Sequence, residues 1–372
     1  MKKICTVIIL FAGLQTALFS EASVWKVTSK KGNIVYLGGT IHLLFKDNNS
    51  IPKEYDWVYE NSETLILEVD MSKISPPKMI EYITKNGVYK DGKTLETELS
   101  PEVYAKLKAY CEENSLQISV LKIMKPWMVI NYLMALKWQK AGITDGVDKY
   151  YFNKAVEDGR KVIGLETIQY QLKLLVSLGE GYENEYVVDA LGDMDQAENH
   201  LHKIVDVWRS GQEQELYELF IKNWKVNFPT MYNNLLVKRN KRWIPKIAGF
   251  LRTPETELVL VGVGHFSGPD SVLEMLKEKG YTVEKLIIET APESNPEDAL
   301  EENADEKPEN KPEKNSTNIL FRKDFRNAWS VGPGTENPAQ YIFRIALRSF
   351  DVRYGFLQYS RGEQNYTSMT SG

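Results

Sequence analysis

A strand-like run that leads into Gly-x-x-His occurs twice in the chain, and this repeat limits the possible folds more than any other feature. The first copy, VYLGGTIHL, carries His42, and the second, LVLVGVGHF, carries His265. Each copy is followed by a segment of helix length and then by an apolar run with a glutamate near its end, Glu68 in LILEVD and Glu289 in LIIET. Short apolar runs that alternate with helix-length segments are typical of β-α-β units. We therefore predict an α/β fold in which two pseudo-repeated halves, each β, Gly-x-x-His, α and β, form one central sheet.

The predicted strands of the two halves cover residues 33–44, 63–70, 257–267 and 283–290. Between the halves, at about residues 72–252, the apolar period is mostly helical. Ser100 followed by Pro101 is a favourable helix start, because serine caps the first turn and proline fits the first helical position. One run in this region, residues 161–167 (KVIGLET), instead predicts a strand that ends in Glu166. We expect a large helical middle insertion that returns once to the sheet.

Both ends of the chain differ in composition from the predicted α/β domain, which spans residues 23–291. Residues 1–22 combine two lysines, an apolar stretch and small residues, which is the layout of a signal peptide cleaved near Ala22. Residues 292–318 are rich in Glu, Pro, Asn and Lys and predict an acidic disordered linker, and residues 319–372 form an aromatic and basic C-terminal extension. We expect an exported protein, periplasmic or secreted, with no membrane span after signal removal.

Composition and short motifs exclude several classes of function. The net charge of −5 and the lack of a basic stripe with interleaved aromatic residues argue against nucleic acid as a partner. Cys5 would leave with the signal peptide, and Cys111, which then remains alone, is predicted to pack in a helix. The sequence contains no Gly-x-Ser-x-Gly elbow, His-Glu-x-x-His helix, Walker loop or Gly-x-Gly-x-x-Gly fingerprint. The common hydrolase and nucleotide-binding classes therefore have no support.

The two Gly-x-x-His histidines are candidate metal ligands because of their place on the predicted strands. The carboxyl ends of parallel strands open into a crevice that binds ligands. Gly39 and Gly262, three residues before each histidine, allow the backbone to turn sharply there. Two imidazoles and one carboxylate suit Zn, Mn, Co or Fe, with positions left for water or substrate. The carboxylates within reach are those of Glu68, Asp70, Glu166 and Glu289.

Two alternatives to this metal site are open. Both Gly-x-x-His histidines could serve only to end their strands. A competing pair, His200 and His202, lies on a predicted helix, where side chains two positions apart diverge and are poorly placed to share an ion.

Together these motifs resemble the TraB/GumN family, relatives of the animal TIKI metalloproteases, which is marked by two Gly-x-x-His motifs and a glutamate after the first. The similarity extends over about residues 30 to 290. It runs through YLGGTIHLL, LILEVDM, GVDKYYFNKAVEDGRKVIGLET, LVKRNKRW and LVLVGVGHFSGPDSVLEMLKEKGYTV. The resemblance implies an α/β core of two related halves and a metal-dependent peptidase activity, which is shown for animal members and usually inferred for bacterial ones.

Carried over onto this sequence, the family motif implies roles for particular residues. Its central positions are His42, Glu68 and His265. Arg239 and Asn240 match an Arg-Asn pair that lines the site, although Arg239 could instead only pair with a carboxylate. Glu166 matches the glutamate of GLET, for which a structural role at the strand end is an equal alternative.

From these observations we expect an exported metal-dependent hydrolase, a peptidase that acts on peptide or protein substrates. His42, His265 and Glu68 would gather a divalent ion (Mn, Co or Zn) that activates water. Glu166 or Glu289 could take the proton, and Arg239 could steady the oxyanion.

Two other classes of function are open at this point. In the first, a non-catalytic binding protein uses the same histidines to sequester a peptide signal or a haem or iron ligand. In the second, the C-terminal extension makes the protein a scaffold. Neither the substrate, the identity of the metal nor the oligomeric state follows from the sequence.

Overall fold

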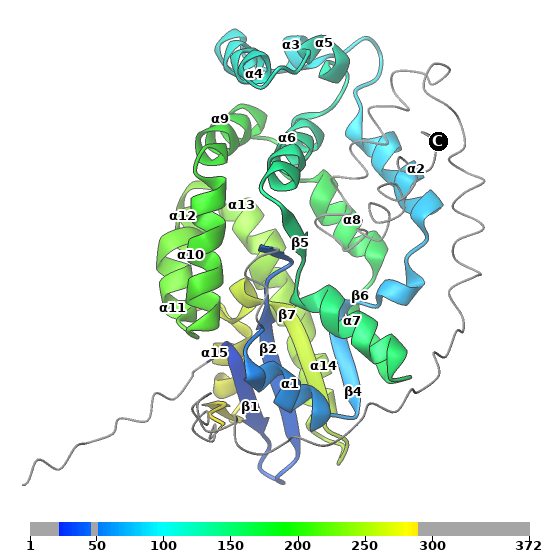
Figure 1. Ribbon diagram of the computed structural model, residues 1–372, viewed down its shortest axis with the longest axis vertical. Helices are drawn as coiled ribbons and strands as arrows, with labels where there is room; N and C mark the ends of the chain where they lie inside the picture. Colours follow the sequence, from blue (N-terminus) through cyan, green and yellow to red (C-terminus); the bar gives the residue numbers. More distant parts are fainter. Residues whose placement is uncertain (1–21, 46–50, 289–372) are drawn as a thin grey trace, which may run out of the picture.

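A computed structural model describes residues 22–45 and 51–288 of the chain (Figure 1). The predicted signal peptide up to residue 21, the predicted linker and the C-terminal extension lie outside the described residues. Glu289 also lies outside them, so its predicted role stays a prediction. In the described part of the chain no helix is long and apolar enough to cross a membrane.

One six-stranded sheet forms the centre of the fold, and a second sheet has two strands. The six strands are β1 (Val24–Thr28), β2 (Ile34–Thr40), β4 (Thr64–Val69), β6 (Lys161–Glu166), β7 (Glu257–Gly262) and β8 (Thr282–Lys285). Their order is β6-β4-β7-β2-β1-β8. The four strands β6, β4, β7 and β2 are parallel, whereas β1 is antiparallel to both β2 and β8. The small sheet pairs β3 (Leu43–Phe45) with β5 (Ile143–Asp145). The predicted α/β fold is confirmed, with a mixed central sheet.

The two predicted β-α-β units are present and interleave within the sheet. The first consists of β2, helix α1 (Lys53–Glu60) and β4, and the second of β7, helix α15 (Val272–Glu278) and β8. Strand β7 lies between β2 and β4, and β8 lies at the far edge beside β1. As a result the two Gly-x-x-His strands are direct neighbours, with Gly39 opposite Val261 and Thr40 opposite Gly262.

The observed strands are shorter than the predicted ones at their carboxyl ends. The run at residues 33–44 divides into β2 and β3, and β7 ends at Gly262, where the 3₁₀ helix η4 (Val263–Phe266) begins. His42 and His265 therefore follow their strands rather than belonging to them. Strand β8 ends at Lys285, so the second unit stops short of Glu289.

Successive strand residues face opposite sides of the sheet, and helices cover both sides. Leu65, Leu67 and Leu258 pack in one cluster with Tyr55 and Tyr59 of α1. Residues at the intervening strand positions, such as Ile66, Val259 and Val261, pack in a second cluster with Trp243 of the helix that precedes β7 and with Leu273 of α15. Because both faces are buried, the strands are nearly continuous apolar runs in the sequence.

The predicted helical middle insertion is observed between β4 and β7, and Figure 1 shows it mainly above and beside the sheet. Ser100 caps the helix at residue 101 as predicted, because its hydroxyl accepts from the Val103 amide at 3.3 Å. The elements are η1 (Met71–Lys73), α2 (Pro76–Gly87), α3 (Leu95–Glu98), α4 (Pro101–Glu113), α5 (Ile118–Leu121), α6 (Pro126–Lys140), α7 (Val147–Glu157), α8 (Ile168–Val176), α9 (Glu183–Met194), α10 (Ala197–Arg209), α11 (Glu213–Leu216), η2 (Tyr217–Ile221), α12 (Lys222–Asn227), α13 (Pro229–Tyr232), η3 (Asn233–Val237) and α14 (Lys238–Phe250). Several of them share a third apolar cluster, in which Cys111 is buried as predicted.

Candidate active site

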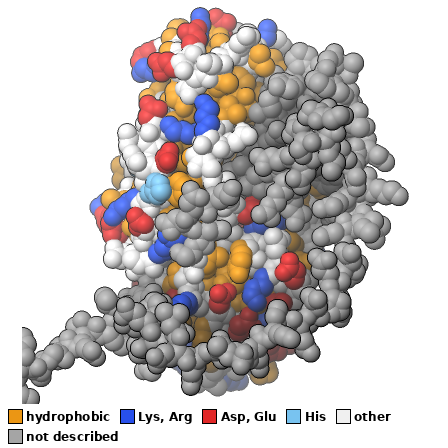
Figure 2. Space-filling model, in the orientation of Figure 1, with side chains coloured by type: hydrophobic (Ala, Val, Ile, Leu, Met, Phe, Trp, Pro, Cys, Tyr) orange, Lys and Arg blue, Asp and Glu red, His pale blue; other side chains and the backbone are white. Residues whose placement is uncertain are grey.

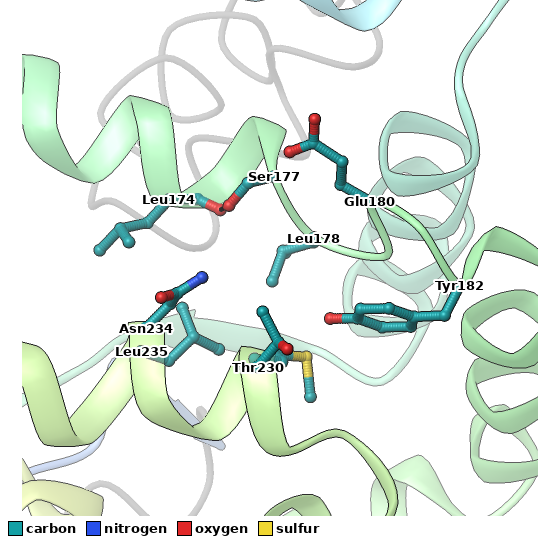
Figure 3. Close-up of a pocket in the computed structure, with 9 residues that line it drawn as sticks. Leu174, Ser177, Leu178, Glu180, Tyr182, Thr230, Asn234 and Leu235 are labelled. Carbon is teal, nitrogen blue, oxygen red and sulfur yellow. Dashed lines mark hydrogen bonds between the residues drawn. The ribbon is translucent and has the colours of Figure 1, made fainter.

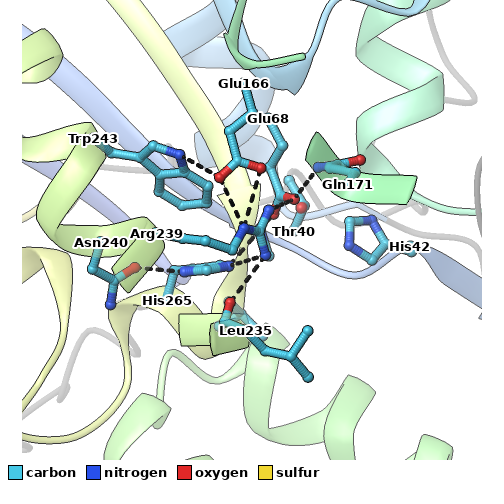
Figure 4. Close-up of polar contacts among 12 residues, drawn as sticks. Thr40, His42, Glu68, Glu166, Gln171, Leu235, Arg239, Asn240, Trp243 and His265 are labelled. Carbon is cyan, nitrogen blue, oxygen red and sulfur yellow. Dashed lines mark hydrogen bonds and ion pairs between the residues drawn. The ribbon is translucent and has the colours of Figure 1, made fainter. Parts of the chain in front are cut away.

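The predicted site residues of four strands lie at one edge of the sheet. Glu68 is near the end of β4, Glu166 ends β6, His265 lies in η4 directly after β7, and His42 follows β2. Since these four strands are parallel neighbours, their carboxyl ends meet at the same edge. Figure 4 shows Glu68, Glu166 and His265 around the guanidinium of Arg239, with His42 to one side. The tertiary structure therefore gathers residues that are more than 200 positions apart, such as His42 and His265.

Arg239 of α14 is the centre of this group and is only 7 % exposed. Its Nε donates to Glu166 Oε1 at 2.9 Å, and its Nη2 donates to Glu68 Oε2. Its Nη1 donates to the carbonyl of Leu235 at 3.1 Å and to His265 Nε2 at 3.0 Å. Although burial alone would lower the pKa of Arg239, the carboxylates of Glu68 and Glu166 outweigh it and raise that pKa. Arg239 is thus a buried, permanently charged counterion that fixes two strand-end carboxylates.

His265 is neutral, and its tautomer follows from its two partners. Because a guanidinium only donates, Nε2 of His265 must accept from Arg239, so the proton is on Nδ1. Nδ1 lies 2.6 Å from Asn240 Oδ1, which accepts this proton in a hydrogen bond. Burial first, and then the charge of Arg239, lower the pKa of His265 to about 3. The ring of Trp243 packs 4.3 Å from the imidazole and holds it in place.

Glu68 is ionised although it is buried. Burial alone would raise its pKa, but the charge of Arg239 and then the two histidines hold the pKa of Glu68 well below its usual range. Its Oε2 accepts from Gln171 Nε2 at 3.0 Å as well as from Arg239, and its Oε1 accepts from the Gly262 amide at 3.0 Å. Oε1 of Glu68 therefore accepts fewer hydrogen bonds than Oε2.

The pKa of Glu166 is raised, whereas that of Glu68 is lowered, although burial and the charge of Arg239 act on both carboxylates. Burial raises the pKa of Glu166 above the ordinary glutamate value despite the hydrogen bonds from Arg239 and from the indole of Trp243, which lies at 2.9 Å. A carboxylate whose pKa is raised towards neutrality is better suited to accept a proton than one held strongly ionised.

His42 is more accessible than the other site residues, with 48 % of its side chain exposed. Its Nδ1 lies 2.8 Å from Asp148 Oδ2, and the second oxygen of Asp148 accepts from the hydroxyl of Thr40 at 2.7 Å. Burial opposes protonation of His42, but the Asp148 carboxylate outweighs it and raises the pKa of His42 to about 9. Gly146 allows this contact, since a Cβ there would overlap the backbone of Ile41 and His42.

The side chains of His42, Glu68 and His265 converge on one small space beside Gly262. A Cβ built on Gly262 would lie 3.4 Å from Glu68 Oε1, 3.7 Å from His42 Nε2 and 3.8 Å from His265 Cδ2. Because Gly262 has no side chain, a reacting group or an ion has room between these three residues.

The donor chemistry at this space fits a divalent ion. Asp148 and Asn240 hold Nδ1 of the two histidines, which directs Nε2 of each away from these partners, and metal-ligating histidines have the same support. His265 Nε2 and Glu68 Oε1 are 3.8 Å apart, a distance that one ion at roughly 2.1 Å from each atom could bridge. Within residues 22–45 and 51–288, however, no three His, Cys, Asp or Glu side chains are already arranged to hold an ion. His265 Nε2 is engaged by Arg239, and it can serve an ion only when Arg239 does not donate to it.

Some predicted candidates do not join this group. Asp70 lies just beyond β4, but its carboxylate accepts from Ser72 at 2.6 Å and pairs with Lys73 at 3.0 Å, so it caps η1 instead. The competing histidines of α10 contact aromatic rings: His202 stacks on Phe45 at 3.8 Å, and His200 meets Phe220 edge to face.

Sequence reasoning missed two residues that position the site, Asp148 and Gln171. Asp148 lies in the GVDKYY stretch, in the first turn of α7 and two residues after its N-cap Gly146, and this position was the available signal. Gln171 gave no signal, because only the packing of α8 against the end of β4 brings it to Glu68.

Comparisons with known proteins show similarity to one family and to two of its relatives. The model of the TraB/PrgY/gumN family matches residues 23–285. The uncharacterized protein YbaP of Escherichia coli (strain K12) is 23 % identical over 256 residues, which is 65 % of this chain and 87 % of that protein. A protein named metalloprotease TIKI homolog, from Amphimedon queenslandica, is 38 % identical over 65 residues, which is 17 % of this chain and 13 % of that protein. No solved structure matches the chain significantly.

Proposed function

The chain belongs to the TraB/PrgY/gumN family, and from this premise we propose that it is an exported metal-dependent hydrolase, a peptidase that acts on peptide or protein substrates. The partial similarity to the TIKI homolog supports the reaction class. The observation that carries the proposal is the convergence of His42 Nε2, Glu68 Oε1 and His265 on the space beside Gly262. Export rests on the signal-like composition of residues 1–22.

His42, His265 and Glu68 would hold the divalent ion, Mn, Co or Zn, whose chemistry is to acidify water and to polarise a carbonyl. Nε2 of each histidine must carry no proton to serve as a ligand. Burial and Arg239 keep His265 neutral, whereas Asp148 favours the charged form of His42, so we expect ion uptake to strengthen as the pH rises.

The remaining residues of the site would handle protons and position. Glu166, whose pKa burial raises, is the proposed acceptor of the proton from water. Arg239 was expected to steady the oxyanion, but its donors already serve Glu68, Glu166, Leu235 and His265. We therefore propose that Arg239 is mainly a positioning residue, which keeps Glu68 ionised and aligned.

The test is cleavage of a defined peptide mixture by the purified full chain, with and without Mn, Co or Zn, followed by mass spectrometry. We expect new fragments only when an ion is present, and a loss of at least roughly 100-fold in turnover for His42→Ala and Glu68→Gln. His202→Ala is the matched control, because this histidine is exposed, lies on α10 and stacks on Phe45 outside the site.

Circular dichroism must show that the variants remain folded. Turnover retained in a folded His42→Ala variant would contradict the proposal. Intact peptide bound without cleavage, or a haem-coloured protein, would favour the non-catalytic binding protein instead.

A further inference from the structure

A groove between α8 and the η3–α14 segment gathers basic side chains beside the candidate active site. It encloses about 510 Å³, and Lys173, Lys238, Lys241 and Arg242 are among the residues that line it. All four are exposed, and no acidic residue lines the groove. On the face shown in Figure 2, by contrast, basic side chains lie among acidic ones.

The positive charge of this groove is only partly compensated within the described part of the chain, where the charge of Lys241 helps to lower the pKa of Asp270. None of its four basic side chains has a carboxylate within 4 Å there, whereas lysines of other helices pair with acids one turn away, such as Lys222 with Glu218. Helix α14 contains no acidic residue at all. Three of the four basic residues lie close together in the sequence on α14, and the fold adds Lys173 from α8 on the other side of the groove.

Both walls of the groove also contribute to the active site. On α8, Gln171 donates to Glu68, and on α14, Arg239 anchors Glu68 and Glu166. A small cavity adjoins the groove, since Leu174, Ser177 and Asn234 line both. Figure 3 shows these residues with Leu235, whose carbonyl accepts from Arg239.

We propose that this basic groove binds an acidic segment of the peptide substrate next to the point of cleavage. The inference rests on the proposed function and adds to it the class of substrate. Exposed lysine and arginine side chains attract carboxylates and orient them, and a groove of about 510 Å³ can take a few side chains of a peptide.

A peptide suits the groove better than a nucleic acid does. The guanidinium of Arg242 already covers one face of the Tyr170 ring in the groove at 4.1 Å, so at most one face is left for stacking a base. The net charge of −5 also opposes a long phosphate polymer more than a short segment with a few carboxylates.

The experiment measures binding without cleavage. The full chain carrying His42→Ala is titrated, without added metal, into three fluorescein-labelled probes: a nonapeptide with alternating glutamates, the same peptide with glutamines, and a single-stranded oligonucleotide. Fluorescence anisotropy gives the dissociation constants at low and high salt. We expect the glutamate peptide to bind about tenfold more tightly than the glutamine peptide, with the difference lost at high salt.

Two double variants locate the interaction. Lys238→Gln with Lys241→Gln should weaken binding of the glutamate peptide about tenfold, because both charges line the groove. Lys30→Gln with Lys31→Gln makes the same change of charge at the exposed turn between β1 and β2 and should leave binding unchanged.

Three results would overturn the inference: equal affinity for the two peptides, no effect of the groove variant, or tighter binding of the oligonucleotide than of the glutamate peptide. Since the assay uses neither metal nor turnover, selective binding of the acidic peptide would stand even if no hydrolysis is found. Conversely, a protein with His42 intact that cleaves acidic and neutral peptides with equal kcat/KM, unaffected by the groove variant, would retain the proposed function and refute this inference.

Discussion

Replacing Arg239 with methionine would leave the carboxylates of Glu68 and Glu166 without their shared counterion. Only 11 % and 4 % of these two side chains are exposed, so water cannot take over the role of the guanidinium. Removing one partner of a buried, hydrogen-bonded ion pair costs about 3–5 kcal/mol. Because a folded domain is stable by roughly 5–15 kcal/mol, we expect Arg239→Met to lower the free energy of unfolding substantially at pH 7.

The pH dependence of this loss has a definite sign. In the wild type, Arg239 lowers the pKa of Glu68, which stabilises the fold above the ordinary carboxylate pKa and is lost as the pH falls through the folded pKa. In Arg239→Met, burial without a counterion raises the pKa of both carboxylates. The folded variant then takes up protons that the unfolded chain does not bind, and its penalty falls as the pH decreases from 7 towards about 4. The two proteins should therefore converge in stability at acidic pH.

Urea unfolding followed by circular dichroism at pH 7 and pH 4 measures both quantities. Lys241→Met is the matched control, because Lys241 is an exposed residue of the same helix, and it should change the free energy of unfolding by less than about 0.5 kcal/mol. A difference between Arg239→Met and the wild type below about 1 kcal/mol at pH 7, or one that grows as the pH falls, would refute this account of the buried charges.

Three further substitutions test the geometry of the site. Gly262→Ala should fold normally, since its Cβ would be no closer than 3.4 Å to neighbouring atoms, but it should abolish turnover by filling the space at the site; an active enzyme with normal circular dichroism would contradict this. Asp148→Asn should lower the pKa of His42 from about 9, as followed by NMR titration of the imidazole, and should reduce turnover roughly 10- to 100-fold. Trp208→Phe removes the indole donor that lies 2.6 Å from the carbonyl of Gly39 and should lower the free energy of unfolding in urea by about 1–3 kcal/mol, whereas an unchanged midpoint would show that this bond contributes little.

The sequence alone determined which segments are strands, where several helices begin and that two histidines follow glycine-containing strand ends. These features depend on neighbours two to four positions apart, which the period of apolar residues and the caps record directly. The same local signals failed at β1 and at β5, which were not predicted, because strands of five and three residues carry no distinct period.

How these residues assemble into a site depends instead on the strand order and on the packing of the helices. The insertion of β7 between β2 and β4 makes the strands that lead to His42 and His265 neighbours. The packing of α7, α8 and α14 brings Asp148 to His42, Gln171 to Glu68 and Arg239 to His265. No local pattern encodes such pairs, because their hydrogen bonds join residues from 25 to more than 100 positions apart. The sequence thus specifies which side chains stand at each strand end, while strand order and helix packing determine which of them meet, since those follow from burying all apolar faces together.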